Sequence, residues 1–199
     1  MPEPLPPGYT LKVHESLPST NDEARRLAES ESAGHGTAVM ALTQTAGRGR
    51  RGRSWVSEPG NLFFSLLLRP KRPVSEVATL SFVASLAVRD MLARWVDPDE
   101  LSLKWPNDVL LSGRKVCGIL LEGVSGAEGL NGVIVGIGVN LRHAPENVIF
   151  PAIALSEASP SEVPEPEEAA RALLARFAPW YQRWEEAGFA AVGEAWLSH

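Results

Sequence analysis

Short apolar runs alternate with amphipathic stretches along the chain, which predicts strands and helices in mixed order. The run at 62–69 is apolar over the length of a strand, so we expect a strand buried on both faces. Ser112-Gly113 between two later runs is typical of a hairpin. The expected strands cover residues 11–14, 37–43, 62–69, 101–105, 109–111, 116–122 and 132–140.

Helical periodicity appears in four places. In the first, Thr20 as N-cap and Glu23 three residues later form a capping box, and Gly34 is a natural stop. Strands, helices and hairpins in this order predict an α+β fold with a mixed, largely antiparallel sheet flanked by helices. The other expected helices cover residues 75–95, 167–187 and 189–197.

One domain is expected over residues 9–199, because a chain of 199 residues can form one well-packed core and is short for two. The Pro-rich residues 1–8 predict a disordered lead-in, and the Pro/Ser/Glu-rich residues 143–164 predict a mobile loop. The stretch 44–61 has no apolar period. Long loops of this kind in compact domains are usually functional or disordered.

Composition narrows the class of protein. A hydrophobic fraction of 44% and a charged fraction of 22% are typical of a globular protein, and no apolar run is long enough to span a membrane. The N-terminus does not resemble a secretory signal. With Cys117 as the only cysteine we expect a cytoplasmic location, and its apolar neighbours predict a buried, unreactive thiol. The net charge of −5 argues against nucleic-acid binding.

One segment departs from this acidic average: residues 47–53, Gly-Arg-Gly-Arg-Arg-Gly-Arg, hold four of the 19 basic residues. The glycine spacing formally matches a dinucleotide fingerprint, but Pro59-Gly60 follows where that motif requires a helix. A solvated charged loop is one interpretation. Glycines that let the backbone fold around a ligand, with guanidiniums that pair with phosphate or carboxylate, favour a flexible anion-binding loop ordered by its ligand.

Five motifs together resemble the catalytic domain of biotin–protein ligases, in that family's order and spacing over residues 10–197. The resemblance implies a catalytic domain of the class II aminoacyl-tRNA synthetase/biotin ligase type. The motifs are Ser19-Thr20-Asn21, Gln44 with the segment 47–55, Lys104-Trp105-Pro106-Asn107-Asp108, the segment 114–122 and Gly136-Ile137-Gly138-Val139-Asn140.

The resemblance implies a reaction in two steps. The carboxylate of biotin attacks the α-phosphate of ATP, giving biotinyl-5′-AMP and pyrophosphate. A lysine of the biotin carboxyl carrier protein of acetyl-CoA carboxylase then takes the biotinyl group and AMP leaves. Since two anions must meet in the first step, cations and Mg²⁺ are expected to offset their repulsion.

The resemblance also assigns roles to residues of this chain. The expected catalytic residues are Lys115, which bridges carboxylate and phosphate oxygens, Arg48 and Arg50, which contact them, and Asp108, which orients a cation or accepts the amine proton. From the turn alone, an exposed hairpin lysine is the favoured interpretation of Lys115, and Asp108 also fits an Asx-turn residue. The expected biotin-binding residues are Ser19, Thr20, Asn21, Gln44, Gly47, Arg48, Gly49, Arg50, Lys115, Gly118, Gly136 and Gly138. The expected nucleotide-binding residues are Arg50, Arg51, Trp55, Asn107, Lys115 and Asn140.

Several of these residues also fit ordinary structural roles. Helix capping explains Thr20, and strand packing explains Gly118, Gly136 and Gly138. Trp105, beside Pro106, is expected to be partly structural. Metal ligands are left unassigned.

Two other functions stay open at this point: a lipoate or octanoate ligase or transferase of the same fold, and a module that binds biotin without transferring it. The Arg/Gly segment and the Lys104–Asp108 motif favour biotin over lipoate. Many family members carry an N-terminal helix-turn-helix domain and a C-terminal SH3-like domain. We expect neither here, so transcriptional repression is not predicted. We expect no nucleic-acid or membrane partner, and a homodimer paired through a sheet edge is a reasonable expectation.

Overall fold

A computed structural model describes residues 3–126, 129–146, 148, 150–159 and 162–199. In this part of the chain a seven-stranded sheet has the order β1-β2-β3-β7-β6-β5-β4. Only β1 and β2 run parallel and every other neighbouring pair is antiparallel, which confirms the mixed, largely antiparallel sheet. The strands are β1 (Thr10–Leu17), β2 (Thr37–Gln44), β3 (Leu62–Leu68), β4 (Leu101–Lys104), β5 (Asp108–Leu111), β6 (Arg114–Gly126) and β7 (Gly129–Val139).

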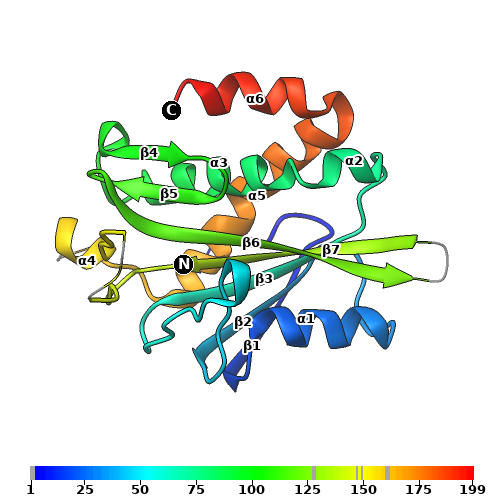
Figure 1. Ribbon diagram of the computed structural model, residues 1–199, viewed down its shortest axis with the longest axis horizontal. Helices are drawn as coiled ribbons and strands as arrows, with labels where there is room; N and C mark the ends of the chain where they lie inside the picture. The colour runs from blue at the N-terminus through cyan, green and yellow to red at the C-terminus, as the bar shows by residue number, and fades with distance from the viewer. Residues whose placement is uncertain (1–2, 127–128, 147, 149, 160–161) are drawn as a thin grey trace.

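Helices cover both faces of the sheet (Figure 1). The long helices α3 and α5 and the last helix α6 lie over one face, and α1 lies on the other. None of the helices in the described ranges is long and apolar enough to cross a membrane. The helices are α1 (Thr20–Glu29), α2 (Val74–Val77), α3 (Leu80–Leu92), α4 (Leu155–Ala158), α5 (Pro166–Ala187) and α6 (Phe189–Leu197), with short 3₁₀ turns η1 (Arg50–Gly52) and η2 (Pro98–Glu100).

The central strand β3 shows how the apolar run is shared between the two faces. All seven of its residues are buried, as expected. Leu66 and Leu68 belong to the main core under α3 and α5, whereas Leu67 packs into a smaller core under α1. Because side chains alternate along a strand, Ser65 points to the same face as Leu67. This α1 face carries the candidate site.

Three expectations differ from the structure. The helix expected over 75–95 is divided into α2 and α3 at Thr79, whose hydroxyl donates to the Glu76 carbonyl and accepts from Trp184 Nε1. The stretch 143–164, expected to be a loop, contains α4 and a short bridge to β6; its residues 147, 149, 160 and 161 lie outside the described part. In the expected lead-in, Leu5 packs against the main core and Glu3 pairs with Arg94; residues 1–2 are not described.

Candidate active site

Small residues of β3, β6 and β7 lie side by side on the α1 face of the sheet. The strand register places Ser65 beside Gly136, Gly136 beside Leu120, and Gly138 beside Gly118. A Cβ atom at Gly138 would lie 2.5 Å from the Trp55 indole, and a Cβ at Gly136 would overlap the Asn21 amide. The glycines are therefore required because Asn21 and Trp55 approach the backbone closely.

The start of α1 borders these small residues and forms a polar wall beside them. Ser19, Thr20 and Asn21 are all buried. The capping-box prediction is wrong: Ser19 occupies the N-cap position, and Glu23 pairs with Arg26 instead. Thr20 is the first residue inside the helix. Its backbone N–H donates to Gln44 Oε1 at 2.8 Å, and its hydroxyl lies 3.2 Å from the same oxygen.

Ser65 completes this wall, and the sequence analysis missed it. It is fully buried, and its Oγ lies 2.7 Å from Thr20 Oγ1 and within hydrogen-bond distance of Asn21 Oδ1. The only sequence signal is a hydroxyl inside an otherwise apolar strand. Such a group must find a partner when buried, because an unpaired hydroxyl in the core costs about 1–3 kcal/mol.

The Arg/Gly segment folds into a small hairpin. Gly49 N–H donates to the Arg53 carbonyl at 2.7 Å and Trp55 N–H to the Gly47 carbonyl at 2.9 Å. A Cβ at Gly47 would lie 2.6 Å from Ser57 Oγ, so glycine is needed there as well. Arg51 sits at the tip with φ of 57°, and both Arg51 and Arg53 are exposed.

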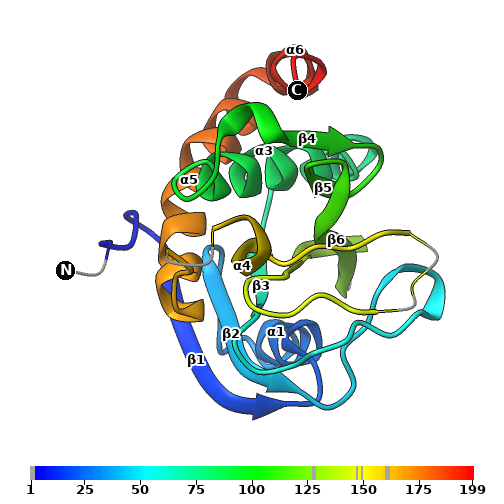
Figure 2. The same cartoon turned by 90° about the vertical axis from the view of Figure 1, so that its left-hand side faces the viewer.

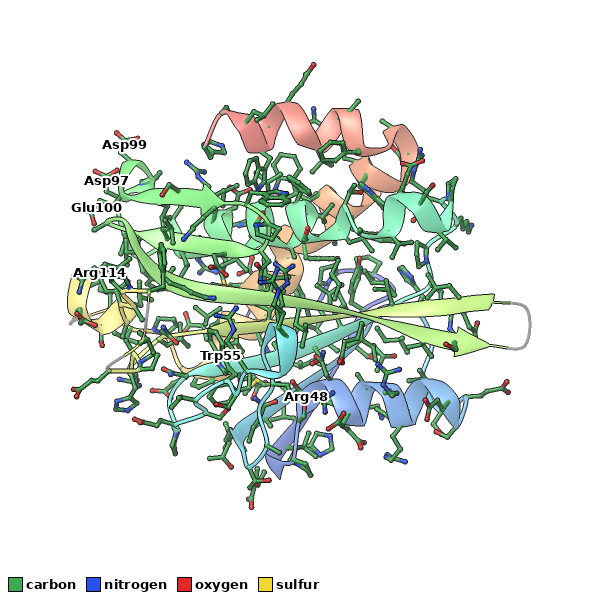
Figure 3. The ribbon with its side chains drawn as sticks, in the orientation of Figure 1. Arg48, Trp55, Asp97, Asp99, Glu100 and Arg114 are labelled. Atoms are coloured by element: carbon green, nitrogen blue, oxygen red, sulfur yellow. The ribbon has the colours of Figure 1, made fainter. Side chains whose placement is uncertain are left out.

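The other two arginines reach across the site in different directions. Arg48 binds Asp22 of α1, with Nη1 2.7 Å from Oδ2, and lies 3.4 Å from the Glu122 carboxylate of β6. The hydrogen bond to Asp22 raises the pKa of Arg48 above its ordinary value. Arg50 Nη1 donates to Asn107 Oδ1 at 2.8 Å. Figure 3 shows Arg48 beside α1 and Trp55 in front of the central strands.

A β-bulge brings Lys115 to the site face. Residues 115 and 118 would point to opposite faces of a regular strand, but the pairing of β5 with β6 shifts between Val109 and Leu110. Val116 and Cys117 consequently both point into the main core, and Lys115 shares a face with Gly118. Its Nζ lies 2.7 Å from Asp108 Oδ1 and 5.6 Å from the centre of the Trp55 ring.

The asparagines of the predicted nucleotide site hold backbone segments in place. Asn107 Nδ2 donates to the Ile119 carbonyl at 2.7 Å, and its Oδ1 accepts from Arg50. Asn140 is buried, and its amide donates to the Ile153 carbonyl at 3.2 Å, so it supports the segment that follows β7. Asn61, which the sequence analysis missed, accepts from three consecutive backbone N–H groups at 141–143.

Aromatic and thiol groups complete the surroundings. Trp105 is 70% exposed, so the expectation that it is partly structural is wrong. Lys104, one residue earlier, places its Nζ 2.9 Å from the centre of the Phe150 ring. Cys117 is fully buried, as expected, and burial raises the pKa of its thiol.

The site thus combines two cationic groups, Lys115 and Arg50, with the glycines of β6 and β7 and with the buried polar groups at the start of α1. Figure 2 shows the 45–61 segment (cyan) on the side of the sheet away from α5. Cations and buried polar groups on one face of a mixed sheet are suited to a small ligand with an anionic end and a polar end.

Comparison with known proteins places the chain in a family. Residues 13–140 match the model of the biotin/lipoate A/B protein ligase family, and the chain belongs to that family. A biotin–[acetyl-CoA-carboxylase] ligase of Paracoccus denitrificans is 45% identical over 187 residues, which are 90% of this chain and 76% of that protein. The bifunctional ligase/repressor BirA of Bacillus subtilis is 35% identical over 201 residues; the match covers 96% of this chain and spans 60% of BirA.

A solved structure supports the same grouping. The biotin protein ligase of Aquifex aeolicus, in complex with biotin and ATP, superposes with a TM-score of 0.76 at 32% identity. The superposition covers 90% of this chain and 73% of that one. The predicted family and fold are therefore confirmed.

Proposed function

We propose that this chain is a biotin–protein ligase, which activates biotin with ATP and transfers the biotinyl group to a lysine of a carrier protein. The observation that carries this proposal is the position of Lys115: its ammonium pairs with Asp108 and lies near Gly118 and Trp55, on the face of the sheet that also holds the polar wall of α1. The relatives named biotin ligases and the relative solved with biotin and ATP support the choice of substrates.

In the first step a biotin carboxylate oxygen bonds to the α-phosphorus of ATP, and the bond from that phosphorus to the pyrophosphate oxygen breaks. Negative charge accumulates where the two anions meet. Lys115 and Arg50 are the cations that stabilise this charge, since Lys115 has one carboxylate partner and Arg50 binds a neutral amide. Closure of the 45–61 segment keeps water from the reactive intermediate.

Mg²⁺ fits the site as a companion of the ATP phosphates. The described residues contain no group of three or more His, Cys, Asp or Glu side chains that would hold an ion by themselves. Mg²⁺ usually binds one or two carboxylates together with substrate phosphates, and Asp108 is placed to be such a carboxylate. When bound, the ion would supply further positive charge to the phosphates.

In the second step a lysine amine of the carrier protein bonds to the biotinyl carbonyl carbon, and AMP leaves with the electron pair of the acyl–phosphate bond. The attacking nitrogen must lose a proton. Asp108, 2.7 Å from Lys115, is the proposed acceptor.

The polar wall recognises the biotin ring in this proposal. The ureido group needs donors for its oxygen and acceptors for its two N–H groups, and Ser19, Thr20 and Gln44 supply both kinds. Trp55 packs directly on Gly118 and Gly138, so in this proposal the indole moves aside before the rest of biotin lies against these two glycines. It then forms the wall toward the nucleotide, with Arg51 at the rim. Asn140 acts through the segment it supports.

The remaining expectations about the surroundings stay predictions. A cytoplasmic location follows from the single cysteine, and a homodimer would use the edge strand β1 or β4. The acceptor is a biotin carboxyl carrier protein, as the names of the relatives imply.

Exchange of labelled pyrophosphate into ATP tests the activation step. We expect exchange that depends on biotin and is not supported by lipoate. Exchange with lipoate instead would identify a lipoate ligase. Biotin binding without exchange would leave a binding module and contradict the ligase assignment.

A further inference from the structure

Glu122 of β6 joins three elements of the site. Its side chain is 23% exposed and points to the α1 face. Asn21 Nδ2 donates to Glu122 Oε2 at 2.8 Å, Arg48 Nη2 lies 3.4 Å from the carboxylate, and Arg25 Nη2 lies 3.7 Å away. The start of α1, the Arg/Gly hairpin and β6 therefore meet at one carboxylate.

The orientation of the Asn21 amide follows from its other partner. Ser65 Oγ lies within hydrogen-bond distance of Asn21 Oδ1, and an amide oxygen can only accept. The Ser65 hydroxyl thus donates to Asn21, and its oxygen also lies 2.7 Å from Thr20 Oγ1. This arrangement turns the Asn21 NH₂ group toward Glu122. A continuous hydrogen-bonded chain runs from the buried strand β3 through Asn21 and Glu122 to Arg48.

Arg48 differs from the other cations of the site because two protein carboxylates already hold it. Both of its terminal nitrogens bind Asp22, at 2.7 Å and 2.6 Å, and one also faces Glu122. A guanidinium in a bidentate pair is fixed in direction and has its charge compensated. It is therefore suited to hold the hairpin against α1 rather than to stabilise charge on a substrate.

We propose that Glu122 is a positioning residue that couples the polar wall of α1 to the Arg/Gly hairpin. Arg48 is the side chain that links the two. The proposal rests on the proposed function, and it changes the role expected for Arg48 from a catalytic cation to a support. When the biotin ring orders Asn21 and Thr20, it also stabilises the closed conformation of the hairpin. The closed hairpin in turn strengthens binding of the biotin ring, because such coupling is reciprocal.

A carboxylate is required at this position. Glu122 faces donors from Asn21, Arg48 and Arg25, and a carboxylate has acceptor sites for all of them and no donor. A glutamine has one acceptor oxygen, so its NH₂ group would oppose at least one of these donors. Glu122→Gln therefore keeps the size of the side chain and removes only the coupling.

The test is steady-state pyrophosphate exchange by the Glu122→Gln variant. We expect the KM for biotin to rise about tenfold, as for the loss of one charge-assisted bond, while kcat at saturating biotin stays within about twofold. Glu167→Gln is the matched control, because Glu167 pairs only with Arg171 on the surface of α5 in the described structure. Asp22→Asn, which removes the other carboxylate that binds Arg48, should also raise the KM for biotin.

A double variant separates coupling from two independent effects. If Glu122 acts through Arg48, the double variant with Glu122→Gln and Arg48→Lys should have a Kd for biotin close to that of the single variant that binds biotin more weakly. We expect the two Kd values to agree within about twofold. A fall in kcat with an unchanged KM, or no change in either, would overturn the proposal while the ligase function stands. If the wild type shows no exchange, the proposed function fails. In that case, calorimetric titration with biotin tests the positioning role of Glu122. A Kd for biotin that is unchanged in Glu122→Gln would overturn this role.

Discussion

At the scale of single residues, the chemistry of the site depends most on Lys115. We predict that Lys115→Ala lowers the pyrophosphate exchange rate by about 100-fold or more, because the ammonium stabilises charge that develops in the transition state. The thermal unfolding temperature should change little, since the ion pair of Lys115 with Asp108 is partly exposed to solvent and such pairs contribute little to stability. Lys12→Ala, on the exposed edge strand β1, is the control. Near-normal exchange in Lys115→Ala would mean that another group supplies this charge.

Cys117 gives a prediction about pH. Burial disfavours the thiolate and so raises the pKa of Cys117 above the ordinary value of about 8.5. The native thiol should therefore react slowly with iodoacetamide from pH 7 to pH 9, without the increase that a free thiol shows. By the same linkage, the free energy of unfolding should fall as the pH rises above about 8.5, where the unfolded thiol ionises.

Comparison with the urea-unfolded chain checks this prediction of a protected thiol. Unfolded Cys117 should be alkylated quickly, at a rate that rises through the ordinary thiol pKa. Fast alkylation of the native protein, with the same dependence on pH, would show that Cys117 is accessible.

The residues that carry chemistry could be predicted from the sequence where their type is unusual for their place. Arg48 among glycines attracts attention from spacing alone. The role of Lys115 comes from the family resemblance, because the hairpin by itself predicts only an exposed lysine. Ser65 and Asn61 could not be found in this way, because their roles depend on partners distant in sequence. Trp105 was misjudged for the same reason: whether a tryptophan beside a proline is covered depends on elements that pack over it.

At the scale of elements, the 45–61 segment should respond to ligands. Trypsin should cleave it near Arg51 and Arg53, which are exposed in the hairpin, and biotin with ATP should suppress this cleavage by stabilising the closed hairpin. Lipoate in place of biotin is the control and should protect weakly. Equal cleavage with and without biotin and ATP would contradict closure over the ligand.

Hydrophobic periodicity is enough to locate most strands and helices, but it does not show how they pair and pack. Short apolar runs identify the strands, because helices bury both faces of the sheet. The bulge at Val116 and the break at Thr79 were not visible, since both depend on hydrogen bonds made across the fold. The pairing order of the strands likewise depends on tertiary contacts that the sequence pattern does not encode.

At the scale of the whole molecule, α5 should contribute strongly to stability. Phe177 is almost completely buried in the main core, stacked against Tyr181 at a ring distance of 6.0 Å. Phe177→Ala should lower the free energy of unfolding in urea by about 3–5 kcal/mol, because it leaves a cavity. Val74→Ala, at a side chain that is 64% exposed, should change it by less than about 0.5 kcal/mol. Similar values for both variants would contradict the placement of α5 in the core.

The central claim is that the site on this chain both activates and transfers biotin. Intact-mass measurement of a biotin carboxyl carrier domain, incubated with the 199-residue chain, biotin and ATP, tests it most directly. We predict that the carrier gains the mass of one biotinyl group, that omission of ATP or biotin prevents this gain, and that the Lys115→Ala chain does not produce it. An unmodified carrier, in a mixture where a known biotin ligase modifies the same preparation, would contradict the claim.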